Sequence, residues 1–255
     1  VHPDVRRMLL TQRAYLEGSR AFAYWLALHG DRAEHHPDED ERKASHDLLA
    51  LLTPVVKAFL TDNGFLCTSL AMQIHGGHGY IRETGIEQYV RDSRINMIYE
   101  GTNTIQSLDL LGRKVLGNNG ATLKKFGKLV GALVAEEGVN EKMAEFITPI
   151  AVLGEQITKF TTEIGFKGFQ NADEVGAAAV DYLRVAGHLV FGYFFARMAQ
   201  VALREIAAGN TDPFYPAKLQ TARFYFAKLF PETATLMRTA RAGSKVLMDT
   251  DLALA

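Results

Sequence analysis

The chain has 255 residues, of which 47% are hydrophobic and 22% charged, which is typical of a soluble globular protein with a sizeable core. Its 28 Lys and Arg against 29 Asp and Glu leave no basic excess of the kind that binds nucleic acid or an anionic membrane. The single cysteine, Cys67, excludes an internal disulfide framework, and no apolar run approaches the about 20 residues of a membrane span, so we expect a cytoplasmic protein.

Apolar residues recur at intervals of three and four through almost the whole chain, which indicates amphipathic helices. No segment shows a sustained strand alternation, so the predicted fold class is all-α. Pro54 predicts a kink or local break in its helix, and Asn63-Gly64 predicts a turn or a helix cap. In chain order the predicted helices span residues 5–28, 43–60, 65–74, 86–95, 102–115, 121–136, 139–166, 173–208, 216–228 and 231–249.

The strongest break in the sequence is Gly117-Asn118-Asn119-Gly120, a run of turn-forming residues between two predicted helices. We therefore expect two helical bundles, one formed by residues 1–118 and the other by residues 119–255.

Residues 98–106 are the most informative stretch, because Glu100 comes directly before a predicted helix start and Gly101 follows it. An acid in this position can simply complement the positive end of the helix dipole, a contribution of about 0.3–1 kcal/mol. Alternatively, Ile98 and Tyr99 supply an apolar wall that would desolvate the carboxylate. In this second interpretation the missing side chain of Gly101 leaves room for a ligand, and Glu100 is a candidate general base.

A second unusual stretch, from Gln73 to Tyr80, lies between two predicted helices and contains Gly76, Gly77 and Gly79. Glycines often only end a helix. Three of them in four positions exceed what a cap needs, and their exposed backbone amides suit a phosphate or pyrophosphate. The stretch is no Rossmann fingerprint, because no strand precedes it and the glycine spacing differs.

Two further residue types have ordinary interpretations. His75 and His78 have a spacing that can serve a metal, but no third ligand is near them in the sequence, so we predict no metal site. Cys67 lies on an apolar helical stretch without a basic neighbour, and we interpret it as an inert core residue.

Together the two stretches, joined by Arg91-Asp92-Ser93-Arg94, resemble the C-terminal signature of the acyl-CoA dehydrogenases. The resemblance implies a C-terminal helical bundle of that family. It also implies a flavoenzyme that takes the α-proton of an acyl-CoA thioester while a β-hydride passes to N5 of FAD. In the family the glutamate of a Tyr-Glu-Gly-Thr motif is the catalytic base, and here that residue is Glu100. Some subfamilies carry the base on another helix, but the intact motif favours Glu100.

The same resemblance implies roles for other residues and for partners. Gly101 would line the substrate pocket, and Thr102 and Thr104 would also serve as hydrogen-bonding residues at a helix start. The implied partners are an acyl-CoA substrate, an electron-transferring flavoprotein and further copies of the chain in a homodimer or homotetramer. The residues implied to contact FAD are Gln73, Gly76 and Gly77, on the cofactor of a neighbouring subunit, and Ile95, Thr102 and Thr104, at the flavin.

The resemblance covers the two halves of the chain unequally. Residues 1–115 are similar to the C-terminal helical domain of the family, whereas residues 121–255 resemble an additional helical domain of a longer subgroup. Members of that subgroup act on 3-methylmercaptopropionyl-CoA or on broad sets of acyl-CoAs. The family's N-terminal helical and middle β-domains have no counterpart in these residues. We therefore expect the chain to be a fragment that is inactive by itself, with catalysis a property of its parent.

Two other functions are compatible with the same fold class. One is a DNA-associated flavoprotein with little dehydrogenase activity, which would need a basic groove that the near-zero net charge does not favour. The other is a non-catalytic helical scaffold in which the motif around Glu100 serves only packing.

Overall fold

The computed structural model describes residues 2–251, and every regular element in this part of the chain is helical, as predicted. Two segments continue a helix with π-type hydrogen bonding, η2 (Asp109–Val115) and η5 (Tyr225–Leu229). The α-helices are α1 (Pro3–His35), α2 (Glu39–Ile74), α3 (Gly77–Tyr80), α4 (Ile86–Ile95), α5 (Asn103–Leu108), α6 (Ala121–Glu137), α7 (Ala144–Gln170), α8 (Asp173–Ala207), α9 (Phe214–Phe224), α10 (Glu232–Ala240) and α11 (Lys245–Met248).

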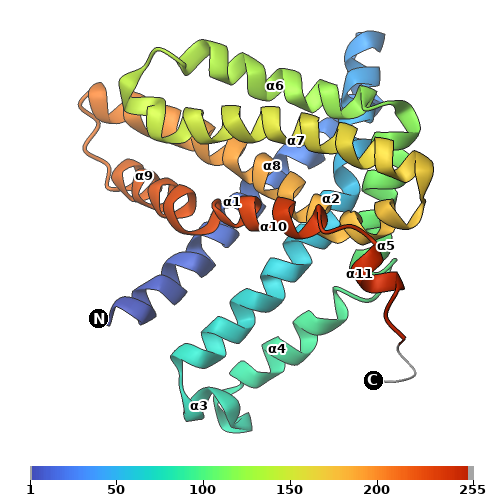
Figure 1. Ribbon diagram of the computed structural model, residues 1–255. Coiled ribbons are helices and arrows are strands. Elements are labelled where there is room, and N and C mark those ends of the chain that lie inside the picture. Colours follow the sequence, from blue (N-terminus) through green and yellow to red (C-terminus); the bar gives the residue numbers. More distant parts are fainter. Residues whose placement is uncertain (1, 252–255) are drawn as a thin grey trace.

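Helix α8 runs through the middle of the bundle and packs against α1, α2, α5, α7, α9 and α10 (Figure 1). Its middle stretch, residues 182–196, is buried almost without interruption, which is the pattern of a helix covered on all sides. Its aromatic side chains Phe191 and Phe195 are fully buried. Residues on both sides of the predicted boundary at Gly117–Gly120 join one hydrophobic cluster around this helix, and the division into two domains stays a prediction.

A projecting arm distinguishes one end of the molecule. Helices α1 and α2 pack along each other, and the C-terminal half of α2 then extends away from the bundle (Figure 1). Helix α3 lies at the tip of the arm, and α4 returns along α2 toward the bundle. Large apolar side chains on this arm are exposed, among them Tyr80 at 74% and Tyr89 at 65%.

The predicted turn at Asn63-Gly64 is wrong, because α2 runs through both residues to Ile74. The Asn63 side chain is buried and its Nδ2 donates to the Phe59 carbonyl, 2.8 Å away, within the helix. Its Oδ1 accepts from Arg184 Nη1 of α8 at 3.3 Å. The polar side chain that made Asn63 a predicted helix end is thus hydrogen-bonded inside the fold.

Pro54 lies inside α2, and the helix continues on both sides of it. Proline has no N–H, so the carbonyl of Ala50 four residues earlier loses its helical donor. Lys114 Nζ from η2 donates to that carbonyl and also pairs with Asp109 Oδ2 at 3.1 Å. A side chain from elsewhere in the chain therefore supplies the hydrogen bond that the proline removes.

Three other predicted boundaries differ from the structure. Helix α1 continues through Gly30 to His35, and the predicted helix 102–115 changes to π-type bonding after Leu108. The predicted helix 231–249 breaks at Gly243, whose φ of 79° lies in the left-handed region. Beyond the break, the Ser244 backbone N and Oγ donate to Glu174 Oε1 at 3.0 and 2.6 Å, which fixes the new direction of the chain.

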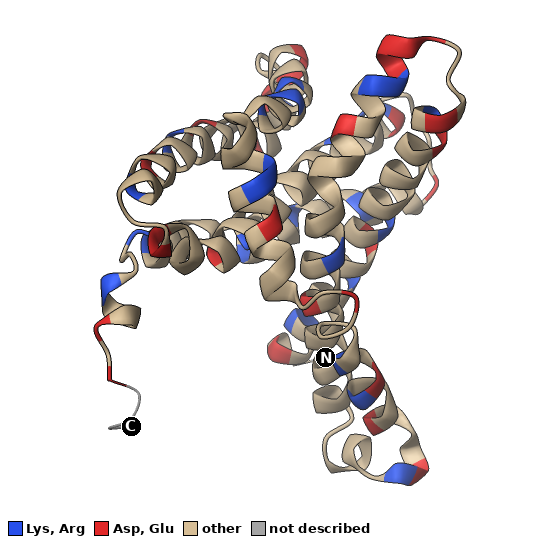
Figure 2. Ribbon diagram, turned by 90° about the vertical axis from the view of Figure 1, so that its right-hand side faces the viewer, with Lys and Arg blue, Asp and Glu red and all other residues tan. Residues whose placement is uncertain are grey.

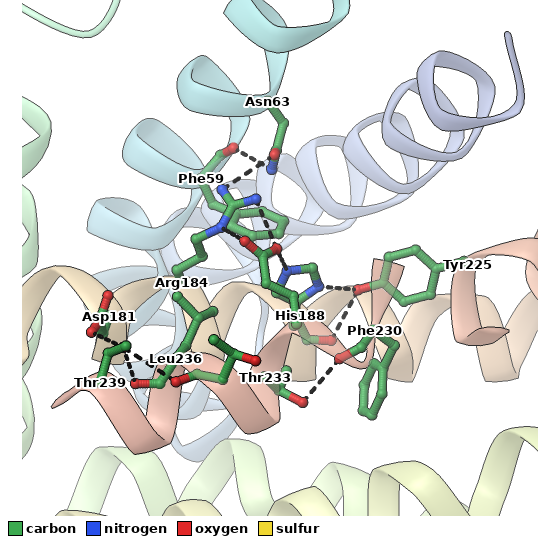
Figure 3. Close-up of polar contacts among 12 residues, drawn as sticks. Phe59, Asn63, Asp181, Arg184, His188, Tyr225, Phe230, Thr233, Leu236 and Thr239 are labelled. Carbon is green, nitrogen blue, oxygen red and sulfur yellow. Dashed lines mark hydrogen bonds and ion pairs between the residues drawn. The ribbon is translucent and has the colours of Figure 1, made fainter. Parts of the chain in front are cut away.

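A polar cluster, called the buried cluster below because His188, Tyr225 and Asn63 are buried while Arg184 and Glu232 are partly exposed, connects α8, η5, α10 and α2 (Figure 3). Arg184 holds the Glu232 carboxylate with two bonds, Nε to Oε1 at 2.8 Å and Nη2 to Oε2 at 2.9 Å. His188 Nε2 lies 2.9 Å from Glu232 Oε2, and His188 Nδ1 lies 2.9 Å from Tyr225 Oη. The Arg184 guanidinium also lies over the Phe59 ring, 5.6 Å from its centroid. Each polar side chain of this cluster thus has a hydrogen-bond partner within it.

The charges of this cluster follow from its burial. A carboxylate can only accept, so His188 Nε2 carries the proton that reaches Glu232, and Nδ1 accepts from Tyr225. Burial lowers the pKa of His188, which keeps its ring neutral. Burial acts to raise the pKa of Glu232, but the hydrogen bonds from His188 and Arg184 prevail and lower it to about 2.

Helix α2 is long and apolar enough to cross a membrane, judged by length and composition alone. The core helix of a soluble protein passes the same test. In this fold Leu51, Leu52 and Val55 of α2 are buried against the bundle, so the criterion is weak evidence for a membrane span.

We predict that Gly187→Ala destabilises the fold. A Cβ at this position of α8 would overlap the Phe59 ring of α2. Overpacking of this kind lowers the free energy of unfolding by about 1–3 kcal/mol. The matched control is Gly127→Ala on α6, where a Cβ meets no atom within 4 Å, and the helix should gain about 0.5–1 kcal/mol. Urea denaturation measures both. Equal changes in the two variants would contradict the predicted packing.

We also predict that the buried cluster makes the protein less stable as the pH is lowered. Below about pH 6.5 the unfolded chain protonates His188, whereas the folded chain keeps it neutral. Below about pH 4.3 the unfolded chain also protonates Glu232, which in the fold stays ionised down to about 2. In both ranges the unfolded state binds more protons, so lowering the pH favours unfolding.

Urea denaturation at a series of pH values tests this expectation, with His188→Gln as the control. The Gln amide keeps a donor for Glu232 and an acceptor for Tyr225 but does not titrate. The difference in unfolding free energy between wild type and variant should therefore shrink as the pH falls from 7 to 5. A difference that is constant over this range would refute the assigned protonation state.

Candidate active site

Glu100 and Gly101 lie in the loop between α4 and α5, and both have left-handed backbone conformations, with φ of 53° and 81°. Apart from glycines, Glu100 and Asn119 are the only described residues with a positive φ. This conformation costs a residue with a Cβ about 1–2 kcal/mol. Strain of this kind persists only where the surroundings hold it, and it is common at functional sites.

Several hydrogen bonds hold the loop. Lys57 Nζ on α2 donates to the Gly101 carbonyl at 2.8 Å, and Gln106 Nε2 donates to the Glu100 carbonyl at 3.2 Å. Thr102 is the N-cap of α5, and its Oγ1 accepts from the Ile105 N–H at 3.3 Å. The predicted helix-start role of Thr102 is thereby confirmed, while the bonds from Lys57 and Gln106 were not predicted.

Asn103, the first residue of α5, is the main connection between this loop and α2. Its Oδ1 accepts from Lys57 Nζ at 2.7 Å, and its Nδ2 donates to Asp62 Oδ1 at 2.6 Å. The Asn103 backbone N–H donates to the Met97 carbonyl at 3.1 Å, which closes the loop on itself. Lys57 and Asp62 are five residues apart on α2, but Asp62 lies beyond the end of the predicted helix 43–60, so no sequence pattern indicated that the two belong together.

The side chains around Glu100 are open to solvent in this chain. Ile98 and Tyr99, expected to form an apolar wall, are 46% and 51% exposed, and Ile95 is 52% exposed. The Tyr99 N–H donates to the Ile95 carbonyl at 3.1 Å, so these residues do belong to one turn next to Glu100. Exposed apolar side chains thus lie next to a carboxylate-bearing residue with a strained backbone.

The structure brings together some of the predicted site residues and separates others. One continuous stretch, from the last residue of α4 to the first turn of α5, lies at the bundle end of the arm and contains Ile95, Glu100, Gly101, Thr102 and Thr104.

Gln73, Gly76 and Gly77 lie at the tip of the same arm (Figure 1). Gln73 is sixteen positions beyond Lys57 on α2, which at the rise of an α-helix is about 24 Å. The predicted residues therefore form two clusters.

The three glycines at the tip of the arm have different physical roles. Gly76 has a φ of 59°, which favours glycine, and a Cβ on Gly79 would overlap the Met72 carbonyl. Gly77 has neither constraint, and a Cβ there meets no atom within 4 Å. The fold thus explains two of the glycines, while the open space beside Gly76 and Gly77 leaves their backbone accessible to a ligand.

The remaining polar residues have structural roles. Asp92 accepts from Gln88 Nε2 at 2.7 Å on the exposed surface of α4. Burial raises the pKa of the Cys67 thiol to about 11, which agrees with an inert residue. Among residues 2–251, no group of three or more His, Cys, Asp or Glu is arranged to hold a metal.

Two protein families match consecutive parts of this chain. Residues 1–116 match the family described as acyl-CoA dehydrogenase, C-terminal domain. Residues 122–251 match the family described as acetyl-CoA dehydrogenase C-terminal like.

A curated relative, the 3-methylmercaptopropionyl-CoA dehydrogenase of Ruegeria pomeroyi, is 37% identical over 96% of this chain and 42% of its own length. A structure of ACDH-11 from Caenorhabditis elegans in complex with C11-CoA superposes with a TM-score of 0.71 at 20% identity. It covers 92% of this chain and 38% of that one. A structure of an acyl-CoA dehydrogenase from Bacillus anthracis complexed with FAD superposes with a TM-score of 0.66 at 21% identity. This superposition covers 94% of this chain and 42% of that one.

The chain thus spans about two-fifths of the length of the relatives it matches. At these identities the two solved structures show the fold alone. The two family matches together cover nearly the whole sequence and include both clusters of the candidate site. The chain belongs to the acyl-CoA dehydrogenase family.

Proposed function

We propose that this chain is the C-terminal part of an FAD-dependent enzyme that introduces an α,β double bond into an acyl-CoA thioester, with Glu100 as the catalytic base. The observation that carries the proposal is the Glu100–Gly101 turn. A carboxylate is held there in a strained conformation, beside a residue without a side chain and among exposed apolar groups. A weakly acidic α-proton requires a positioned base of this type.

The residues of the turn fit distinct steps of this reaction. The Glu100 carboxylate takes the α-proton, and Gly101 leaves space for the thioester to approach. Ile98 and Tyr99 contribute one apolar wall, and the rest of the enzyme would complete the desolvation of Glu100. FAD, when bound, would accept the β-hydride. Ile95, Thr102 and Thr104, close to this turn in the chain, would contact the flavin.

The second cluster supports a site shared between subunits. Gln73, Gly76 and Gly77 lie about 24 Å along α2 from the Glu100 turn, and open space adjoins both glycines. We infer that this tip reaches the FAD of a neighbouring subunit, which makes a homodimer or homotetramer part of the active enzyme. An electron-transferring flavoprotein as the acceptor of the electrons and a cytoplasmic location also remain proposals.

The alternative of a DNA-associated flavoprotein has little support in the charge distribution. Lys and Arg alternate with Asp and Glu along the helices and form no continuous basic stripe (Figure 2). A protein that neutralises many phosphates needs such a stripe. A purely structural role for the motif leaves the strained backbone of Glu100 without an explanation.

We predict that Glu100→Gln abolishes dehydrogenation in the full-length gene product. The amide keeps the shape of the side chain but cannot accept a proton, so the rate should fall by at least about 10²-fold. The measurement is an anaerobic titration of the flavin absorbance with a panel of acyl-CoAs. The wild type should bleach with at least one class of thioester.

The control is Glu155→Gln, an exposed acid on α7, which should leave bleaching unchanged. Bleaching of the Glu100→Gln variant at the wild-type rate would exclude Glu100 as the base. Bound flavin that no thioester reduces in the wild type would favour a protein without dehydrogenase activity.

A further inference from the structure

We propose that Lys57, Asp62 and Asn103 form a clamp that positions Glu100 for proton abstraction. This inference rests on the proposed function, since it concerns how the base is held. All three residues act through the backbone of the Glu100 turn, so they are positioning residues rather than catalytic ones.

The first argument is the backbone of the turn. Two successive left-handed residues, Glu100 and Gly101, do not hold themselves in place, because their conformation is unfavourable for a residue with a Cβ. The Gly101 carbonyl accepts from Lys57 Nζ at 2.8 Å across the gap between the loop and α2. This bond fixes the peptide that follows Gly101, while Gln106 Nε2 holds the Glu100 carbonyl at 3.2 Å, so the backbone that directs the carboxylate is held on both sides of Gly101.

The second argument is the orientation of the Asn103 amide. Its Oδ1 faces the Lys57 ammonium at 2.7 Å, and its Nδ2 faces Asp62 Oδ1 at 2.6 Å. An ammonium can only donate and a carboxylate can only accept, so a flipped amide would mispair with both. The two charges of α2 therefore allow one orientation of Asn103, and Asn103 begins the helix that follows the base.

The third argument is electrostatic. Lys57 Nζ contacts two neutral oxygens, those of Gly101 and Asn103, so its charge is not cancelled by a direct ion pair. Burial lowers the pKa of Lys57, while Asp62 and Glu100 oppose that shift. Burial raises the pKa of Asp62, while the bond to Asn103 opposes it. The clamp thus holds the ammonium close to the base with neutral groups between them.

The fourth argument is the rigidity of the support. Asn63 directly follows Asp62 on α2, and its side chain is bonded to Arg184 of the buried cluster. The same Arg184 is fixed by Glu232 of α10. The turn of α2 that holds the loop is therefore held from its other side by helices of the C-terminal half, and a site on so rigid an element keeps its geometry.

The test compares variants in the full-length gene product. Lys57→Met removes the donor, and Lys57→Arg retains one. Lys43→Met changes an exposed lysine on the same helix, far from the loop, and is the matched control. Lys57→Met should reduce the rate of flavin reduction by on the order of 10²-fold, because a displacement of about 1 Å of a catalytic group has this effect. The KM for acyl-CoA should change less than about twofold, and Lys57→Arg should recover part of the rate.

Hydrogen exchange gives a readout that does not depend on turnover. The Asn103 amide, bonded to the Met97 carbonyl, should exchange about tenfold faster in Lys57→Met than in wild type, with no change in Lys43→Met. Asn103→Asp provides a second variant of the same shape. It places a carboxylate against Asp62 and should slow flavin reduction as Lys57→Met does.

The outcomes separate the two proposals. If Glu100→Gln is inactive while Lys57→Met and Asn103→Asp reduce flavin at the wild-type rate, the clamp does not position the base. The same conclusion follows if the rate falls but KM rises in proportion, since the residues then serve binding. If Glu100→Gln itself remains active, the assignment of the base fails instead.

Discussion

The burial of α8 on all sides is the constraint on which the rest of the structure depends. A helix without a polar face must be covered by neighbours, and six other helices do so here. Glycines let these neighbours approach closely, as Gly187 does for Phe59 of α2 and Gly18 for Phe191. The arm, the loop and the C-terminal helices all take their positions from contacts with this one element.

Helix α2 links that core to the candidate active site. On one side its Phe59 and Asn63 contact Arg184 of α8. On the other side its Lys57 and Asp62 contact the loop that carries Glu100. The C-terminal half of the chain thereby has a physical connection to the turn around Glu100, although none of its residues was expected in the site.

The sequence alone predicts a large part of this protein. Apolar spacing indicates the helices, and the Tyr-Glu-Gly-Thr motif identifies the family. The sequence predicts the structure less well where tertiary contacts determine the local conformation. Asn63-Gly64 has the local chemistry of a turn, yet a guanidinium 121 residues later pairs with Asn63 and the helix continues.

The buried cluster has no sequence signature for a related reason. Arg184 and His188 sit four residues apart in an apolar helix, and their common partner Glu232 follows more than 40 residues later. The left-handed backbone at Glu100 was likewise not predicted, because φ depends on the bonds that Lys57 and Gln106 make to the loop.

The proline in α2 has a consequence for the order in which the chain can acquire its structure. The carbonyl of Ala50 obtains its donor from Lys114, 64 residues further on. During synthesis the first half of α2 leaves the ribosome well before that lysine. The helix therefore carries an unsatisfied carbonyl at Ala50, which only water can bond, until η2 has docked. Docking of η2 therefore completes the hydrogen bonding of α2.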